Sequence, residues 1–138
     1  MDACCFFTAF RSPNGGSSMI LELGRLGRLS VVTSVLVVQE ACKNIKNKVG
    51  QEPVTKFHRA IRAGIIEIVP TPDAAAIARW ENLTHAKDCH VLAGAAAANV
   101  DCLITLDRKH LLTAKVKDHF PFPVKTPADF LDAFLPGS

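Results

Sequence analysis

The sequence predicts an α/β protein of three layers, with helices on both faces of a central parallel sheet. Segments of strand-like composition alternate with helical segments along the chain, which is typical of parallel strands joined by helical crossovers. Residues 102–105 are continuously apolar, as expected for a strand covered on both faces. No repeat or linker divides the 138 residues. We therefore expect residues 1–138 to form a single domain.

The first part of the chain is expected to form a loop, a helix, a strand and a second helix. Turn-forming residues at 12–18 predict the loop, and a short helix at about 19–23 stops at the glycine that follows. Residues 29–33 are expected to form a strand. A helix at 34–49 begins with a serine suited to capping and is followed by a glycine.

The second part of the chain continues the alternation. A proline in the first turn and a terminal glycine predict a helix at 53–64. The β-branched run 65–69 predicts a strand, and 73–82 has a helical pattern. The alanine-rich segment 88–98 predicts a helix that stops at an asparagine. A capping box with proline at the first helical position opens a last helix at 126–134.

The charge, the cysteine content and the lack of long apolar runs indicate in which compartment the protein is expected. The net charge of +3 does not by itself demand a nucleic-acid partner. The five cysteines are odd in number and lack zinc-site spacing, which favours reduced thiols in a cytoplasmic protein. No apolar run has the length of a membrane span, and the N-terminus does not resemble a secretory signal. We expect a cytoplasmic protein that does not contact membranes.

Basic residues gather between Lys43 and Arg62, against the single acid Glu52. This run is either a solvated helical face or a surface that binds phosphates. If RNA is the ligand, the cations expected to contact it are Arg11, Lys43, Lys46 and Arg59.

Acidic residues follow or precede the predicted elements at one rim of the sheet. Asp107 comes just after a strand, and Asp88 begins a helix. Glu40 lies nearly two turns into the helix after another strand, and Asp2 precedes an apolar segment. Because strand ends and helix starts share a rim in parallel sheets, the four carboxylates are expected to converge there. The alternative is that each is an ordinary surface charge.

Clustered carboxylates without cysteine or histidine are the ligands that Mg²⁺ and Mn²⁺ prefer. Such an ion can activate a water for attack on a phosphodiester and stabilise the charge that develops. We therefore interpret Asp2, Glu40, Asp88 and Asp107 as candidate metal ligands and catalytic residues.

The same residues resemble the motifs of the PIN domain family, in their order and over almost the whole chain. Residues 2–8 are similar to the first motif, in which a Ser or Thr follows an Asp by six residues. Residues 33–40 resemble the second motif, with its glutamate on a helix. Residues 87–95 and 100–107 resemble the third and fourth, and 126–131 the closing helix. The third and fourth motifs in tandem are the more specific.

This resemblance implies a PIN-like domain with metal-dependent endoribonuclease activity on single-stranded RNA. It also implies a role as the toxin of a toxin–antitoxin pair, with an antitoxin protein or a homodimer as partner. Thr8 and Thr105 are expected to support the carboxylates. The other interpretation of Thr8 is a hydroxyl bonded to helix backbone, and that of Thr105 is strand packing.

The chain departs from the family pattern at two positions. The opening strand should precede Asp2, yet only Met1 does, so we expect a missing first strand through N-terminal truncation or a defective sheet. Cys4 stands where the family usually has asparagine. Both departures favour the alternative function, a catalytically impaired PIN fold that binds RNA or a partner protein.

Other readings account less well for the sequence. A nucleotide-binding domain lacks its glycine-rich loop, and a phosphatase lacks the second acid at Cys4. Phe6, Phe7 and Phe10 are expected in the core. His90 is expected to be packed or exposed and not to be a ligand. His110, three residues after Asp107, is expected on the surface, with contact to RNA as the alternative.

Overall fold

A computed structural model of the chain describes residues 1–135. The helices are α1 (Ala3–Arg11), α2 (Gly16–Arg25), α3 (Val35–Lys48), α4 (Gln51–Arg62), α5 (Ala74–Ala78), α6 (Cys89–Ala97), α7 (Ala114–His119) and α8 (Pro127–Phe134). A 3₁₀ turn, η1 (Ala86–Asp88), precedes α6. The strands are β1 (Val31–Ser34), β2 (Ile66–Val69), β3 (Leu103–Ile104) and β4 (Val124–Lys125). The chain is thus a mixed α/β protein, as the alternation predicts.

The strands form two separate parallel sheets of two strands each. In one, β1 pairs with β2 from Val31 opposite Ile66 to Ser34 opposite Val69. In the other, Leu103 of β3 lies opposite Val124 of β4. Residues 1–135 therefore show the predicted parallel strands in two small sheets and show no single central sheet. The reason is that β1 and β3 have no strand between them.

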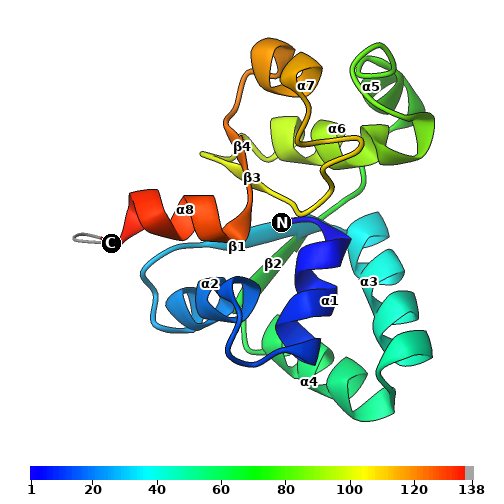
Figure 1. The fold of residues 1–138 in the computed structure, drawn as a ribbon. Coiled ribbons are helices and arrows are strands. Elements are labelled where there is room, and N and C mark those ends of the chain that lie inside the picture. Colours follow the sequence, from blue (N-terminus) through cyan, green and yellow to red (C-terminus); the bar gives the residue numbers. More distant parts are fainter. Residues whose placement is uncertain (136–138) are drawn as a thin grey trace.

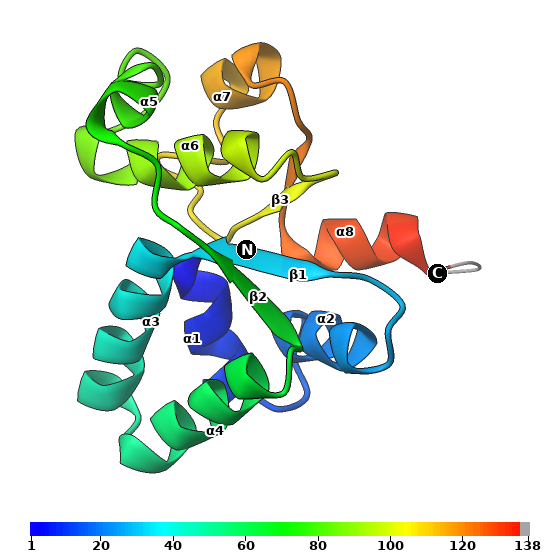
Figure 2. The same cartoon turned by 180° about the vertical axis from the view of Figure 1, so that it is seen from behind.

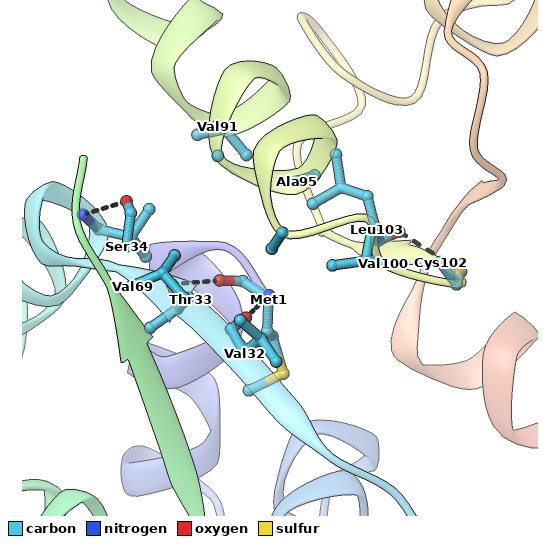
Figure 3. A pocket seen from close by; sticks show the side chains of 13 residues that line it. Met1, Val32, Thr33, Ser34, Val69, Val91, Ala95, Val100, Cys102 and Leu103 are labelled. Carbon is cyan, nitrogen blue, oxygen red and sulfur yellow. Dashed lines mark hydrogen bonds between the residues drawn. The ribbon is translucent and has the colours of Figure 1, made fainter. Parts of the chain in front are cut away.

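Met1 and Asp2 lie between the two sheets and bond to both. The Met1 amine donates to the Val32 carbonyl at 2.8 Å, and the Thr33 hydroxyl donates to the Met1 carbonyl at 3.0 Å (Figure 3). On the other side, the Asp2 amide donates to the Ile104 carbonyl at 3.0 Å. These residues fill one end of the space between β1 and β3, at the carboxyl ends of both strands.

Beyond Met1 the space between the sheets is a cavity of about 440 Å³. Leu29 and Val32 line it beside β1, and Val100 and Cys102 line it beside β3. The edges of β1 and β3 that face this cavity have no strand partner in the described part of the chain. The sheet that the sequence predicts is therefore split along a line that begins at Met1.

Helices cover both faces of the β1–β2 sheet. Helices α1 to α4 lie on one side of it and α5 to α7 on the other, as both views show (Figures 1 and 2). Fully buried side chains, including Phe6, Phe57, Leu92 and Leu111, form the core. The rings of Phe6 and Phe57 stack with centroids 5.2 Å apart. Among residues 1–135, the helices are too short or too polar to cross a bilayer.

Several predicted helix ends are confirmed by their caps. The Ser34 hydroxyl accepts the Val37 amide at 3.4 Å to begin α3, and the Thr126 hydroxyl accepts the Asp129 amide at 3.1 Å to begin α8. Asn99 ends α6 with a positive φ of 51°, the left-handed conformation expected of it.

Other elements differ from the prediction. Helix α2 begins at Gly16 and not at Met19, because the Ser18 hydroxyl bonds to the carbonyls of Ala9 and Ser12 at 2.7 Å and so ties α2 to the end of α1. The helix expected at 73–82 stops at Ala78. Helices α1 and α7 were not predicted.

Candidate metal centre

The four acidic residues singled out in the sequence all line one pocket of about 350 Å³. Asp2 is the N-cap of α1, Glu40 lies within α3, Asp88 ends η1 before α6, and Asp107 follows β3. Their elements meet at the rim formed by the carboxyl ends of β1 and β3. The structure therefore brings together side chains that are as much as 105 residues apart in the sequence.

Asp88, Asp107 and His110 form the tightest group of side chains in the pocket region. One ligand atom from each lies within 4.8 Å of the others. The His110 Nδ1 atom is 2.9 Å from Asp88 Oδ2 and 3.6 Å from Asp107 Oδ2. Two carboxylates and one imidazole at these distances are a donor set that divalent cations accept.

A tight turn fixes Asp107 and carries His110 into the group. Asp107 Oδ1 accepts the backbone amides of Lys109 at 3.1 Å and of His110 at 2.9 Å. This leaves Asp107 Oδ2 directed to the group. His110 was expected on the surface, so its position is a correction, and the signal in the sequence was its spacing of three residues from Asp107.

Asp88 has one carboxylate oxygen that is buried and not hydrogen-bonded. Asp88 Oδ2 is shielded from solvent, and His110 Nδ1 approaches it outside hydrogen-bond geometry. Burial raises the pKa of the Asp88 carboxyl above its ordinary value, and the negative charge of Asp107 raises the pKa further. Buried polar atoms normally have partners. A cation between Asp88 and Asp107 would supply one, so the donor set fits a metal ion.

Thr105 joins Asp2 to Asp107. Its fully buried hydroxyl donates to Asp2 Oδ2 at 2.8 Å and accepts the Asp107 amide at 3.1 Å. Asp2 Oδ1 accepts the Ala3 amide at 2.7 Å. Asp2 is therefore held by these two hydrogen bonds and by a third from Cys4 Sγ, and it lies outside the group of Asp88, Asp107 and His110. Its negative charge still reaches Asp88, where it adds to the rise in pKa.

Glu40 faces the pocket from α3 and contacts a buried histidine. The His90 Nε2 atom lies 2.9 Å from Glu40 Oε1, and the His90 side chain is only 6 % exposed. Neither ring nitrogen of His90 has a well-directed hydrogen bond in residues 1–135. The sequence left open whether His90 is packed or exposed, and its proximity to Glu40, which depends on how α6 packs, was missed.

The remaining predicted residues differ in position. The Thr8 hydroxyl donates to the Cys5 carbonyl at 3.0 Å and lies 2.9 Å from the Ser17 hydroxyl, which corrects its expected contact with a carboxylate. Six residues after Asp2 in a helix, Thr8 lies on another face. Cys4 Sγ is 3.5 Å from Asp2 Oδ2 and accepts the Leu106 amide at 3.4 Å.

The expected RNA-binding cations are all exposed, but none of them lines the acidic pocket. Lys43, Lys46 and Arg59 are not among the residues that line the acidic pocket, within the part of the chain that the structure describes. Lys46 lies on a face of α3 that is rotated away from Glu40, whereas Lys43, three residues after Glu40, lies on a neighbouring part of the helix surface outside the pocket. Arg11 lies over the ring of Phe7, which does line the pocket.

Comparisons with protein-family models, curated proteins and solved structures found no match for this chain. The arrangement of its own residues therefore carries the functional argument.

Proposed function

We propose that the chain is a metal-dependent endoribonuclease that hydrolyses phosphodiester bonds of single-stranded RNA. The observation that carries this proposal is the buried, unbonded Oδ2 atom of Asp88 beside Asp107 and His110, in a pocket lined by two further acids. A structural ion pair would satisfy that oxygen with a lysine or arginine. A site that is left short of positive charge is suited to binding a cation.

Asp88 and Asp107 are the residues that would hold Mg²⁺ or Mn²⁺, with His110 as a third donor. When bound, such an ion lowers the pKa of a coordinated water and stabilises charge on phosphate oxygens. Because His110 is a nitrogen donor, the set favours Mn²⁺ over Mg²⁺, which strongly prefers oxygen.

The other residues position these donors and the substrate. Thr105 holds Asp2 and the backbone of Asp107 in fixed positions. Asp2 and Glu40 add negative charge to the pocket walls, so metal-free protein should repel a phosphate. Glu40 is half-exposed and faces the pocket, where it can accept a proton from the attacking water. In the hydrolysis, the water oxygen bonds to phosphorus and the bridging P–O bond breaks.

The proposed nuclease function also has consequences for the fold and for the protein partners of the chain. We infer a PIN-like architecture of three layers, in which the two parallel sheets correspond to the halves of one central sheet. An antitoxin protein would then cover the acidic pocket, with an arginine paired to its carboxylates. A homodimer remains part of this proposal as the resemblance implies it.

The test is cleavage of a labelled, unstructured RNA in EDTA, Mg²⁺ or Mn²⁺. We expect cleavage with Mn²⁺, none in EDTA, and a loss of at least about 100-fold in Asp88→Asn. Asp101→Asn is the matched control, because Asp101 is an exposed acid at the opposite end of the β3 segment. It should cleave at the parent rate.

Two results would decide against the nuclease. Cleavage retained by folded Asp88→Asn would exclude this site. Salt-dependent RNA binding with no cleavage in either metal would instead support the impaired RNA-binding scaffold. Thermal unfolding of each variant shows whether a loss of cleavage is a loss of folding.

A further inference from the structure

A groove leads away from the acidic pocket between α1 and α3. On α3, residues Glu40, Asn44 and Lys48 follow one another at intervals of four and all line the pocket. On α1, Ala3 and Phe7 have the same spacing and line its other wall. Residues spaced by four share one face of a helix. One row of side chains on each helix therefore lines the groove. The groove runs from the acidic residues toward the C-termini of α1 and α3.

The character of this groove changes from acidic to basic along its length. Glu40 and Asp2 lie at one end, and Arg11 and Lys48 lie at the other. Glu40 and Lys48 are eight residues apart, which corresponds to about 12 Å along a helix. Phe7 lies between the two ends of the groove.

Phe7 and the two cations form a compact group. The Lys48 ammonium is 5.6 Å from the centroid of the Phe7 ring, and the Arg11 guanidinium carbon is 5.7 Å from it. Both cations are exposed, and Phe7 is partly buried and packs against the edge of the core, where it was expected. Within residues 1–135, the ion pairs of the chain involve neither Arg11 nor Lys48.

We propose that Phe7, Arg11 and Lys48 form a subsite for the nucleotide next to the one at the acidic pocket, and so select single-stranded RNA. The Phe7 ring would stack on the base, and the two cations would bind its phosphate. A partly exposed aromatic ring beside cations is a combination that holds single strands, whereas paired bases are not free to stack on it. The subsite rests on the proposed nuclease function.

This subsite explains how a substrate binds next to so many carboxylates. The acids repel phosphate until a metal is bound, so affinity has to come from positive charge at a distance. Arg11 and Lys48 supply two charges at the end of the same groove. Lys43 and Lys46 are also exposed cations of α3 but do not line the pocket, which makes them a matched comparison.

The test measures binding of a labelled oligouridylate to Asp88→Asn protein in EDTA, so that cleavage does not interfere. In this background we expect Arg11→Gln with Lys48→Gln to weaken binding at least about tenfold. The slope of log K against log salt should become shallower by about 0.7, because the two cations bind one phosphate of a single strand. Phe7→Leu should weaken binding about tenfold with no change in slope.

Lys43→Gln with Lys46→Gln is the control and should leave both affinity and slope near the parent values. The subsite is overturned if the control pair weakens binding as much as Arg11 and Lys48 do, or if the latter pair has no effect in folded protein. Because binding is read without cleavage, the expected losses would stand even if no metal supports hydrolysis. If the wild type cleaves RNA normally but the variants bind RNA as tightly as the parent, the subsite is refuted and the proposed nuclease function stands.

Discussion

At Asp88, burial and the charge of Asp107 both raise the pKa of the carboxyl above its ordinary value. The folded protein therefore holds this proton more tightly than the unfolded chain does. Protonation of Asp88 therefore favours the folded state. This contribution to the free energy of unfolding is complete when the pH is below the carboxyl's pKa in the unfolded chain, and it is lost as the pH rises through the pKa in the folded protein. At neutral pH the metal-free fold thus carries an unfavourable charge that a bound cation would offset.

This linkage predicts opposite effects of Asp88→Asn with and without metal. In EDTA, the variant should be more stable than the wild type at pH 7, and the difference should vanish as the pH falls below about 4. With saturating Mn²⁺, the wild type should gain several degrees in Tm and the variant little. Urea unfolding across this pH range measures the first effect, and thermal unfolding measures the second. A variant that is less stable than the wild type in EDTA at pH 7 would contradict the account.

Residue types could be read from the sequence, but their orientation could not. Asp88 and Asp107 were recognisable by their positions beside predicted elements. The roles of His110 and His90 were not recognised. The position of His110 depends on a turn that is closed by hydrogen bonds to the Asp107 side chain, and the contact of His90 with Glu40 depends on how α6 packs. A histidine becomes a donor or a contact only through such local geometry.

At the scale of elements, capping residues were the most dependable signal. Ser34 and Thr126 were predicted as caps and are caps, because an N-cap depends on a few neighbouring residues. Helix α1 was missed because the capping bond from the Ala3 amide to Asp2 Oδ1 uses an acid that was interpreted as a ligand alone. The groove lies between α1 and α3, and α1 was not predicted. The groove could therefore not be predicted either.

The two caps allow stability and site geometry to be separated. Ser34→Ala and Thr126→Ala should each cost about 1 kcal/mol of unfolding free energy, because each leaves a helix amide without its acceptor. Only α3 carries Glu40, so Ser34→Ala should also weaken Mn²⁺ binding severalfold, while Thr126→Ala leaves it unchanged. Urea unfolding and calorimetric Mn²⁺ titration measure these effects. Equal Mn²⁺ affinity in the two variants would show that the α3 start does not position the pocket.

At the scale of the whole molecule, alternating elements correctly indicated parallel strands with helices on both faces. They could not indicate how the strands are joined, because pairing requires a neighbour at each edge. In the structure, β1 and β3 face each other across a cavity. Among the described residues, only Met1 and Asp2 connect the two strands by backbone hydrogen bonds, Met1 to β1 and Asp2 to β3. The division of the sheet follows from this single gap.

Burial lowers the pKa of the Met1 ammonium, which lies where a strand would have an amide. An added segment of about five β-branched residues joined to Met1 would remove that buried charge. It would run parallel to β1 and β3 and give both free edges a partner. We expect this extension to raise the free energy of unfolding by at least about 2 kcal/mol, through the apolar area that it buries.

The matched control is an extension of equal length with proline at alternate positions, because proline donates no hydrogen bond to a neighbouring strand. Urea unfolding should separate the two extensions, and amide hydrogen exchange should show new protection in β1 and β3 with the first alone. The same five-residue segment added as a free peptide should stabilise far less, since Met1 would keep its buried ammonium. If the two extensions are equally stable, the cavity is not a strand site, and the two sheets are independent parts of the fold.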